Sequence, residues 1–138
     1  MKTIKQLMSN LGVVVNAETT FETLIELMDQ QNIGAILIAN ETEKDTIIGI
    51  VTESDLRNVN DNCLTAKGLM STQLYYINND DSIPNAAKIM LNNEVNHLLV
   101  KDNNKVVGII SSTDLLRWIA NHSSNDQYVL FFVWNGWI

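Results

Sequence analysis

The sequence lacks several features that would assign the protein to a specialised class. It has a single cysteine, Cys63, among 138 residues, so it can form no internal disulfide, and the cytosol is the simplest compartment to expect. No stretch approaches the roughly 20 apolar residues that a membrane-spanning helix needs. The first ten residues, MKTIKQLMSN, also lack the apolar run of a signal peptide. The sequence therefore predicts a cytoplasmic protein.

Positive charge is scarce as well. Nine Lys and Arg against 16 Asp and Glu give a net charge of −7 at pH 7, which disfavours nucleic acid and anionic membranes as partners. Any phosphate site must therefore create its own local field. The composition, 46% hydrophobic and 18% charged, is typical of a globular protein with one domain or two very small ones that share a core.

Catalytic constellations are also missing from the sequence. No cluster of metal ligands, no nucleophile with its base and no paired catalytic carboxylates can be recognised. Cys63 lies between the two halves of the chain without an obvious activating partner. We therefore predict that the protein is not an enzyme, with no catalytic residue, no metal and no cofactor.

What the sequence does contain is an internal repeat. Residues 49–56 read GIVTESDL and residues 108–115 read GIISSTDL. Upstream, KQLMS at 5–9 recurs as KGLMS at 67–71, a shift of 62 (67 − 5) that falls to 59 (108 − 49) for the later motif. A length difference of this kind belongs in a surface hairpin loop. Two copies of one structural unit are therefore expected.

Each copy predicts the same order of elements. A short strand, at 13–15 or 75–77, precedes a helix of about three turns, two strands joined by a hairpin, and a last helix. The first long helix is expected to present an apolar stripe of Phe21, Leu24, Ile25 and Met28. The spacing of Thr19 and Glu22 predicts a capping box at its start, and Ser82 and Pro84 predict the start of the equivalent helix in the second copy.

The predicted fold class is α+β (α/β), with two β-α-β-β-α repeats packed with pseudo-twofold symmetry. The first repeat spans residues 1–61, the second spans 62–122, and an apolar tail spans 123–138. A copy of about 60 residues is marginal as an independent domain. We therefore expect the two copies to bury each other's sheets.

The repeated hydroxyl and carboxylate suggest a binding site. Thr52 and Ser111 precede a helix start, where a partial positive charge favours phosphate, and Asp55 and Asp114 offer acceptors that suit the paired hydroxyls of a ribose. The same residues would also serve as ordinary helix caps without any ligand. The residues alone leave these two interpretations open.

The quoted motifs, with NIGAILI at 32–38 and EVNHLLV at 94–100, resemble the cystathionine beta-synthase (CBS) domain family. The resemblance runs from about Lys2 to Ala120 and is to a tandem pair, a Bateman-type module. It implies two clefts between the repeats, a homodimer, and an adenosine ligand such as AMP, ADP, ATP or S-adenosylmethionine. It also implies that each motif aspartate contacts ribose and each motif hydroxyl contacts phosphate.

The resemblance implies further ligand contacts on the strands. The family often holds the adenine at the positions of Val14, Val15, Tyr76 and Ile77. Main-chain groups commonly contact the base edge at the positions of Ala35, Ile36, His97 and Leu98.

The sequence also departs from the family pattern. Ala35 replaces a common histidine, and Leu37 and Leu99 replace a common proline. Glu53 beside the first site and the acidic pair at 80–81 add negative charge. One cleft is therefore expected to be empty, or to prefer a ligand with fewer phosphates or a cationic one such as S-adenosylmethionine.

Three functions follow from these observations. The first is a standalone regulatory module that binds an adenosine derivative and acts on a protein partner. The second is a structural or dimerisation module with decayed clefts, and the third and weakest is an enzyme. The apolar run at 128–134 with Trp137 is expected to be covered, within a homodimer or by a partner.

Overall fold

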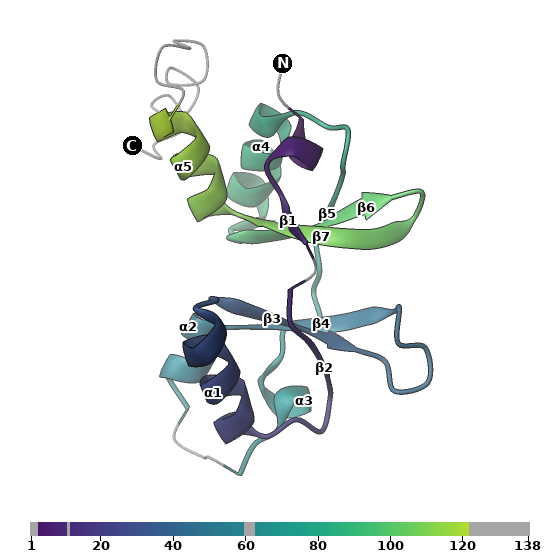
Figure 1. Ribbon diagram of the computed structural model, residues 1–138, viewed down its shortest axis with the longest axis vertical. Coiled ribbons are helices and arrows are strands. Elements are labelled where there is room, and N and C mark those ends of the chain that lie inside the picture. Colours follow the sequence, from purple (N-terminus) through teal and green to yellow (C-terminus); the bar gives the residue numbers. More distant parts are fainter. Residues whose placement is uncertain (1–2, 11, 60–62, 122–138) are drawn as a thin grey trace. The chain divides into compact units, whose positions relative to one another are not determined.

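The structure, a computed structural model, describes residues 3–10, 12–59 and 63–121 (Figure 1). The chain forms two compact units. We call Leu11–Leu74 the central unit, and Met1–Asn10 together with Tyr75–Ile138 the terminal unit. Within the described ranges, no helix is both long enough and apolar enough to cross a membrane.

The central unit has a three-stranded sheet in the order β2-β3-β4. Its elements are β2 (Val14–Asn16), α1 (Phe21–Gln31), β3 (Ala35–Ala39), β4 (Ile47–Thr52), α2 (Glu53–Arg57) and α3 (Ala66–Leu69). Strand β2 is parallel to β3, and β3 and β4 form an antiparallel hairpin. In Figure 1 the helices of this unit lie on one face of the sheet. The predicted order β-α-β-β-α is present.

The terminal unit repeats this order and adds one strand. Its elements are η1 (Ile4–Gln6), β1 (Ser9–Asn10), β5 (Tyr76–Asn78), α4 (Ile83–Asn93), β6 (His97–Asp102), β7 (Lys105–Ser111) and α5 (Ser112–Asn121). The sheet has the order β1-β7-β6-β5, with β5 parallel to β6 and β1 antiparallel to β7. The α+β fold class is therefore as predicted.

The entry segments of the two copies are exchanged between the units. Ile4 N–H donates to Asp81 O at 3.0 Å in the terminal unit, and Ala66 N–H donates to Thr19 O at 2.8 Å in the central unit. These two bonds are equivalent under the shift of 62 residues. The compact units therefore divide the chain near residues 10 and 74, whereas the sequence repeats divide it near residue 61.

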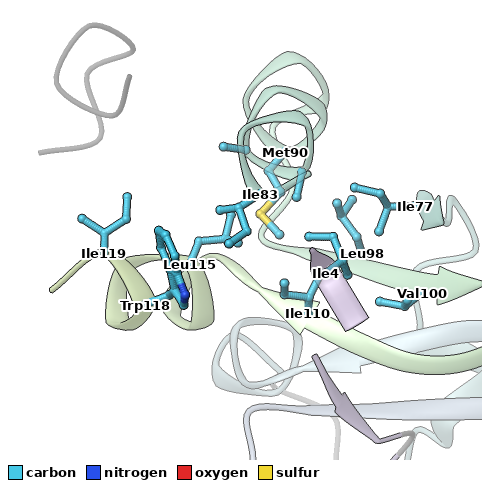
Figure 2. Close-up of a cluster of buried hydrophobic side chains, with 12 residues drawn as sticks. Ile4, Ile77, Ile83, Met90, Leu98, Val100, Ile110, Leu115, Trp118 and Ile119 are labelled. Carbon is cyan, nitrogen blue, oxygen red and sulfur yellow. The ribbon is translucent and has the colours of Figure 1, made fainter. Parts of the chain in front are cut away.

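Each unit has its own apolar core beneath its sheet. Figure 2 shows the core of the terminal unit, in which side chains of α4 and α5 meet those of β6 and β7. Ile4 is fully buried in this core although it lies at the other end of the chain. In the central unit, Leu24 and Met28 of the expected stripe are buried, but Ile25 is 42% exposed. The apolar stripe of α1 is therefore narrower than predicted.

The helix starts follow the predictions with one correction. Ser82 caps α4 by accepting from Asn85 N–H at 3.2 Å, with Pro84 in the first turn. Helix α1 is capped by Thr20, which accepts from Thr23 N–H at 3.2 Å, and not by Thr19 with Glu22. Phe21 N–H, the first donor of the helix, donates to Leu64 O. The N-cap of α1 is therefore Thr20, one residue later than expected.

Candidate functional site

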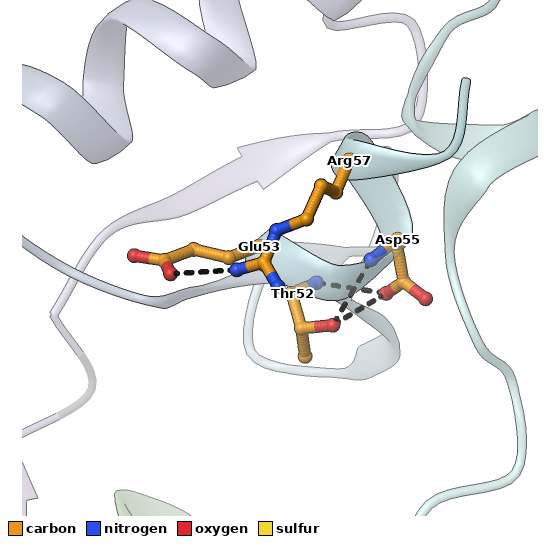
Figure 3. A network of polar contacts seen from close by, with 4 residues as sticks. All are labelled: Thr52, Glu53, Asp55 and Arg57. Carbon is orange, nitrogen blue, oxygen red and sulfur yellow. Dashed lines mark hydrogen bonds and ion pairs between the residues drawn. The ribbon is translucent and has the colours of Figure 1, made fainter. Parts of the chain in front are cut away.

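The aspartate motif of the central unit forms a closed polar network at the start of α2 (Figure 3). Asp55 Oδ2 accepts from the N–H of Thr52 at 2.8 Å and from its hydroxyl at 3.1 Å. Asp55 N–H donates to Thr52 Oγ1 at 3.4 Å. This is a reciprocal capping box, which satisfies backbone donors that a helix start otherwise leaves free.

The second motif repeats this arrangement at the start of α5. Asp114 Oδ2 accepts from Ser111 N–H at 2.8 Å, and Asp114 N–H donates to Ser111 Oγ at 3.1 Å. Arg117 Nη1 lies 3.5 Å from Asp114 Oδ1. The capping interpretation of both motifs is therefore realised in the structure.

The capping bonds occupy only one oxygen of each aspartate. The capping bonds that each carboxylate accepts end on Oδ2, and in the described part of the chain no hydrogen bond holds Asp55 Oδ1. Among the described residues, Asp114 Oδ1 contacts only the Arg117 guanidinium, whose side chain is 67% exposed. A carboxylate has about four lone-pair sites, so a cap and a ligand contact are compatible on one aspartate.

The strand register brings the other candidate residues to the same end of each sheet. Ala35 lies opposite Thr52, and His97 lies opposite Ser111. We call Val14, Val15, Ala35, Ile36, Thr52 and Asp55 the central site. We call Tyr76, Ile77, His97, Leu98, Ser111 and Asp114 the terminal site.

Burial separates side-chain candidates from main-chain candidates within these sites. Ile36, Ile77 and Leu98 belong to the hydrophobic cores, so only their main chains could contact a ligand. Val14 and Tyr76 are 37% and 38% exposed. Their side chains are therefore available to an apolar face of a ligand.

The main chain at the start of β3 is oriented by its neighbours. Leu37 N–H donates to Val13 O at 3.1 Å, toward β2. Because alternate residues of a strand direct their amide groups to the same side, Ala35 also directs its N–H and C=O toward that side, just before the ladder begins at Val14. In the terminal unit, Leu99 N–H donates to Tyr75 O at 2.9 Å, which is the equivalent bond. The N–H and C=O of His97 are therefore directed toward β5 in the same way.

One acidic segment expected near a site lies elsewhere in its unit. Asp81 follows the C-terminal end of β5, and its carboxylate accepts from Ser82 N–H and from Asn85 Nδ2, both at 2.7 Å. His97 is at the N-terminal end of the parallel neighbour β6. Asp81 thus supports the Ser82 cap of α4 at the other end of the sheet, and its charge is remote from the terminal site.

Sequence reasoning did not single out Lys101. Its Nζ lies 3.9 Å from the centroid of the Tyr76 ring, a cation–π contact between β6 and β5. No motif signalled this pair, because it arises from strand register.

Within the described ranges, no group of three or more His, Cys, Asp or Glu could hold a metal ion. The predictions for the tail, 123–138, lie outside the described residues.

Relatives of known sequence cover the chain to different extents. "CBS domain-containing protein YhcV" of Bacillus subtilis is 29% identical over 132 residues, which is 92% of this chain and 90% of the relative. "Uncharacterized protein MK0525" of Methanopyrus kandleri is 33% identical over 106 residues, which is 70% of this chain. The chain spans 53% of that relative, and only 33% of protein RP505 of Rickettsia prowazekii.

Solved structures share the fold. The CBS domain pair of protein MJ0100, in complex with 5′-methylthioadenosine and S-adenosyl-L-methionine, has a TM-score of 0.78 at 20% identity and covers 88% of this chain and 98% of that one. CBSX2 in complex with AMP has a TM-score of 0.74 at 18% identity, with 89% and 99% covered. The CBS domain family model matches residues 4–61 and 66–121. The chain therefore belongs to the CBS domain family and contains a tandem pair of these domains.

Proposed function

We propose that the chain is a regulatory module that binds an adenosine derivative, of the class of AMP, ADP, ATP or S-adenosylmethionine. The observation that carries the proposal is the repeated aspartate, which keeps Oδ1 outside its own capping bonds in both copies. Structures of the same fold have been solved with AMP, 5′-methylthioadenosine and S-adenosyl-L-methionine. The proposal extends that ligand class to this chain.

The proposed contacts take the roles that the family resemblance implies and combine them with the geometry of each site. Oδ1 of Asp55 or Asp114 would accept from ribose hydroxyls, while Oδ2 continues to cap the helix. The main chain of Ala35 or His97 would contact the edge of the base, and Val14 or Tyr76 would contact its face. The hydroxyl of Thr52 or Ser111 would turn from its aspartate toward a phosphate oxygen.

The regulatory part of the proposal concerns what the ligand acts on. A ligand can shift an equilibrium only by its differential affinity for two states. We propose that an occupied site changes the affinity of the chain for a second copy or for a protein partner. The expected homodimer and the expected protein partner both belong to this proposal.

A structural or dimerisation role is the second candidate. It is favoured by the capping boxes, because Thr52 with Asp55 and Ser111 with Asp114 account for the motif without any ligand. Under this alternative the clefts have decayed, and the protein acts through protein–protein contact alone.

A thermal-shift panel separates the two functions. AMP, ADP, ATP and S-adenosylmethionine are each added to the wild type and to the double variant Asp55→Asn/Asp114→Asn. Asparagine keeps an acceptor for the cap but replaces the other acceptor with an amide that donates. A ligand at 100 times its Kd adds about 2.7 kcal/mol of stability. We expect at least one compound to raise Tm in the wild type, and a weakening of about 10- to 150-fold in the variant.

A set of melting curves that none of the four compounds moves would contradict the proposal and favour the structural role. Equal shifts in the wild type and the double variant would place the ligand away from the two aspartates.

A further inference from the structure

The central and terminal sites differ at the residue that follows the motif hydroxyl. Glu53 and Ser112 are equivalent (112 − 53 = 59), and their N–H groups donate to Gly34 O at 3.1 Å and to Asn96 O at 2.9 Å. Glu53 Oε1 lies 3.6 Å from the position that a Cβ on Gly34 would occupy. The Glu53 carboxylate therefore lies beside Gly34, which immediately precedes Ala35 and the start of β3.

The terminal site has neutral groups at the same place. Ser112 Oγ lies 3.4 Å from Asn96 Oδ1, in a hydrogen bond between two uncharged side chains. Asn96 immediately precedes His97, as Gly34 precedes Ala35. The serine and asparagine occupy the place that the Glu53 carboxylate fills in the central unit.

The difference leaves the two sites with unequal charge. Glu53 and Arg57 form an exposed ion pair at 3.7 Å, so Glu53, Asp55 and Arg57 sum to −1. Glu53 and Asp55 project to opposite sides of α2, and the Arg57 guanidinium extends to Glu53 (Figure 3). In the terminal site Asp114 and Arg117 sum to zero. Lys101 on the Tyr76 ring adds a positive charge to the same sheet.

We propose that the two sites sort adenosine ligands by charge. The terminal site takes a phosphate-bearing nucleotide, and the central site takes an adenosine derivative without a phosphate, either neutral or a cationic sulfonium. The inference rests on the proposed function, since it assigns a ligand class to each of the two sites. It follows from charged side chains that differ between otherwise matching copies.

Elementary electrostatics sets the size of the effect. One unit charge several ångströms from a phosphate, in a solvent-exposed setting, changes affinity by about tenfold. Salt screens such an effect, with a Debye length of about 10 Å at 0.1 M. A neutral ligand is insensitive to both the charge and the salt. Adenosine and AMP therefore form a matched pair of probes that share the base and the ribose.

The test is calorimetric titration of the full chain with adenosine and with AMP, at low and at high salt. Asp55→Asn and Asp114→Asn assign each binding event to the central or the terminal site. Glu53→Gln removes the charge and keeps the shape of the side chain. Ser112→Glu introduces a charge, and Ser112→Gln is its uncharged control. Glu41→Ser removes an exposed carboxylate from the β3–β4 loop, at the other end of the strands.

We expect AMP to bind more tightly at the terminal site in the wild type. Glu53→Gln should strengthen AMP at the central site by about tenfold, and Ser112→Glu should weaken AMP at the terminal site by about tenfold. The affinity for adenosine should be the same in Glu53→Gln and Ser112→Glu as in the wild type. The control variants Ser112→Gln and Glu41→Ser should leave the affinity for AMP unchanged. High salt should reduce both differences.

Two outcomes overturn the inference in distinguishable ways. If adenosine binds and AMP affinity ignores Glu53→Gln and Ser112→Glu, or AMP occupies the central site in preference, charge sorting is wrong while the proposed function stands. If neither adenosine nor AMP binds either site, both the proposed function and the inference fail.

Discussion

Asp55 and Asp114 combine a structural contact with an oxygen that the cap does not use. The spacing of hydroxyl and aspartate predicted both a cap and a ligand contact, and the residues alone could not separate them. The structure shows that Oδ2 carries the capping bonds in both copies. The cap and the proposed ligand contact would therefore use different atoms of one side chain, a separation that no sequence pattern can reveal.

Stability measurements can isolate the capping role at the residue scale. Asp114→Ala removes the acceptor for Ser111 N–H and should lower the free energy of unfolding by about 0.5–2 kcal/mol, the usual cost of losing a capping side chain. Asp114→Asn keeps an acceptor and should cost less, chiefly the loss of charge at the helix start, about 0.3–1 kcal/mol. Urea unfolding measures both. Equal losses in the two variants would show that the bond to Ser111 N–H does not stabilise α5.

Backbone strain at Glu94 gives a second prediction at this scale. Glu94 ends α4 with φ 54° and Asn32 ends α1 with φ 52°, both in the left-handed region. That region costs a residue with a Cβ about 1–2 kcal/mol, whereas asparagine tolerates it better and glycine adopts it freely. Glu94→Gly should therefore raise the free energy of unfolding by up to about 1 kcal/mol, and Asn32→Gly by less. Urea midpoints that reverse this order would contradict the account.

At the scale of the elements, the sequence predicted the order of helices and strands in each copy. It did not predict that the first segment of each copy packs with the other copy. The shift of 62 residues located both entry segments, and the shift of 59 located both hairpins. The repeat pattern cannot show which copy an entry segment packs against, because the equivalent strands β4 and β7 offer it the same hydrogen-bonding edge. In the structure Ser9 pairs with Ile109, and the equivalent Ser71 pairs with Ile50.

The exchange also explains the glycine in each repeated motif. A Cβ on Gly49 would collide with the Met70 side chain, and one on Gly108 would lie 2.5 Å from Ser9 O and 2.8 Å from Met8 Sδ. The methionine of each LMS segment therefore packs on the glycine of its structural unit. Sequence reasoning noted both residues but could not connect them.

Alanine at these two glycines should give unequal effects. Overpacking a close contact costs about 1–3 kcal/mol. Gly108→Ala meets backbone and should be the more destabilising, while Gly49→Ala meets the movable side chain of Met70. Adding Met70→Ala should offset part of the Gly49→Ala loss in a double-mutant cycle measured by urea unfolding. A purely additive cycle would contradict the packing described here.

Across the whole molecule, the terminal unit is assembled from both ends of the described chain. Ile4 is 0% exposed and belongs to the same core as Leu98 and Ile110. Truncation of a buried isoleucine costs about 2–5 kcal/mol. Ile4→Ala should therefore weaken the second copy of the sequence repeat, although Ile4 lies in the first.

Hydrogen exchange read by mass spectrometry locates this loss. Peptides from β5–β7 and α4 should lose protection in Ile4→Ala more than peptides from β2–β4 and α1. Leu24→Ala, a buried leucine of the central core, is the matched control and should give the opposite pattern. Loss of protection mainly in residues 14–57 for Ile4→Ala would contradict the exchange of entry segments.

The measurement that tests the central claim most directly is an amide NMR titration of the full chain with AMP and with S-adenosylmethionine. We expect saturable shifts concentrated at the starts of α2 and α5 and at the first residues of β3 and β6, and their loss in Asp55→Asn/Asp114→Asn. Spectra that neither compound changes, or shifts confined to regions such as the loop at 40–46, would contradict the assignment of these positions to an adenosine site.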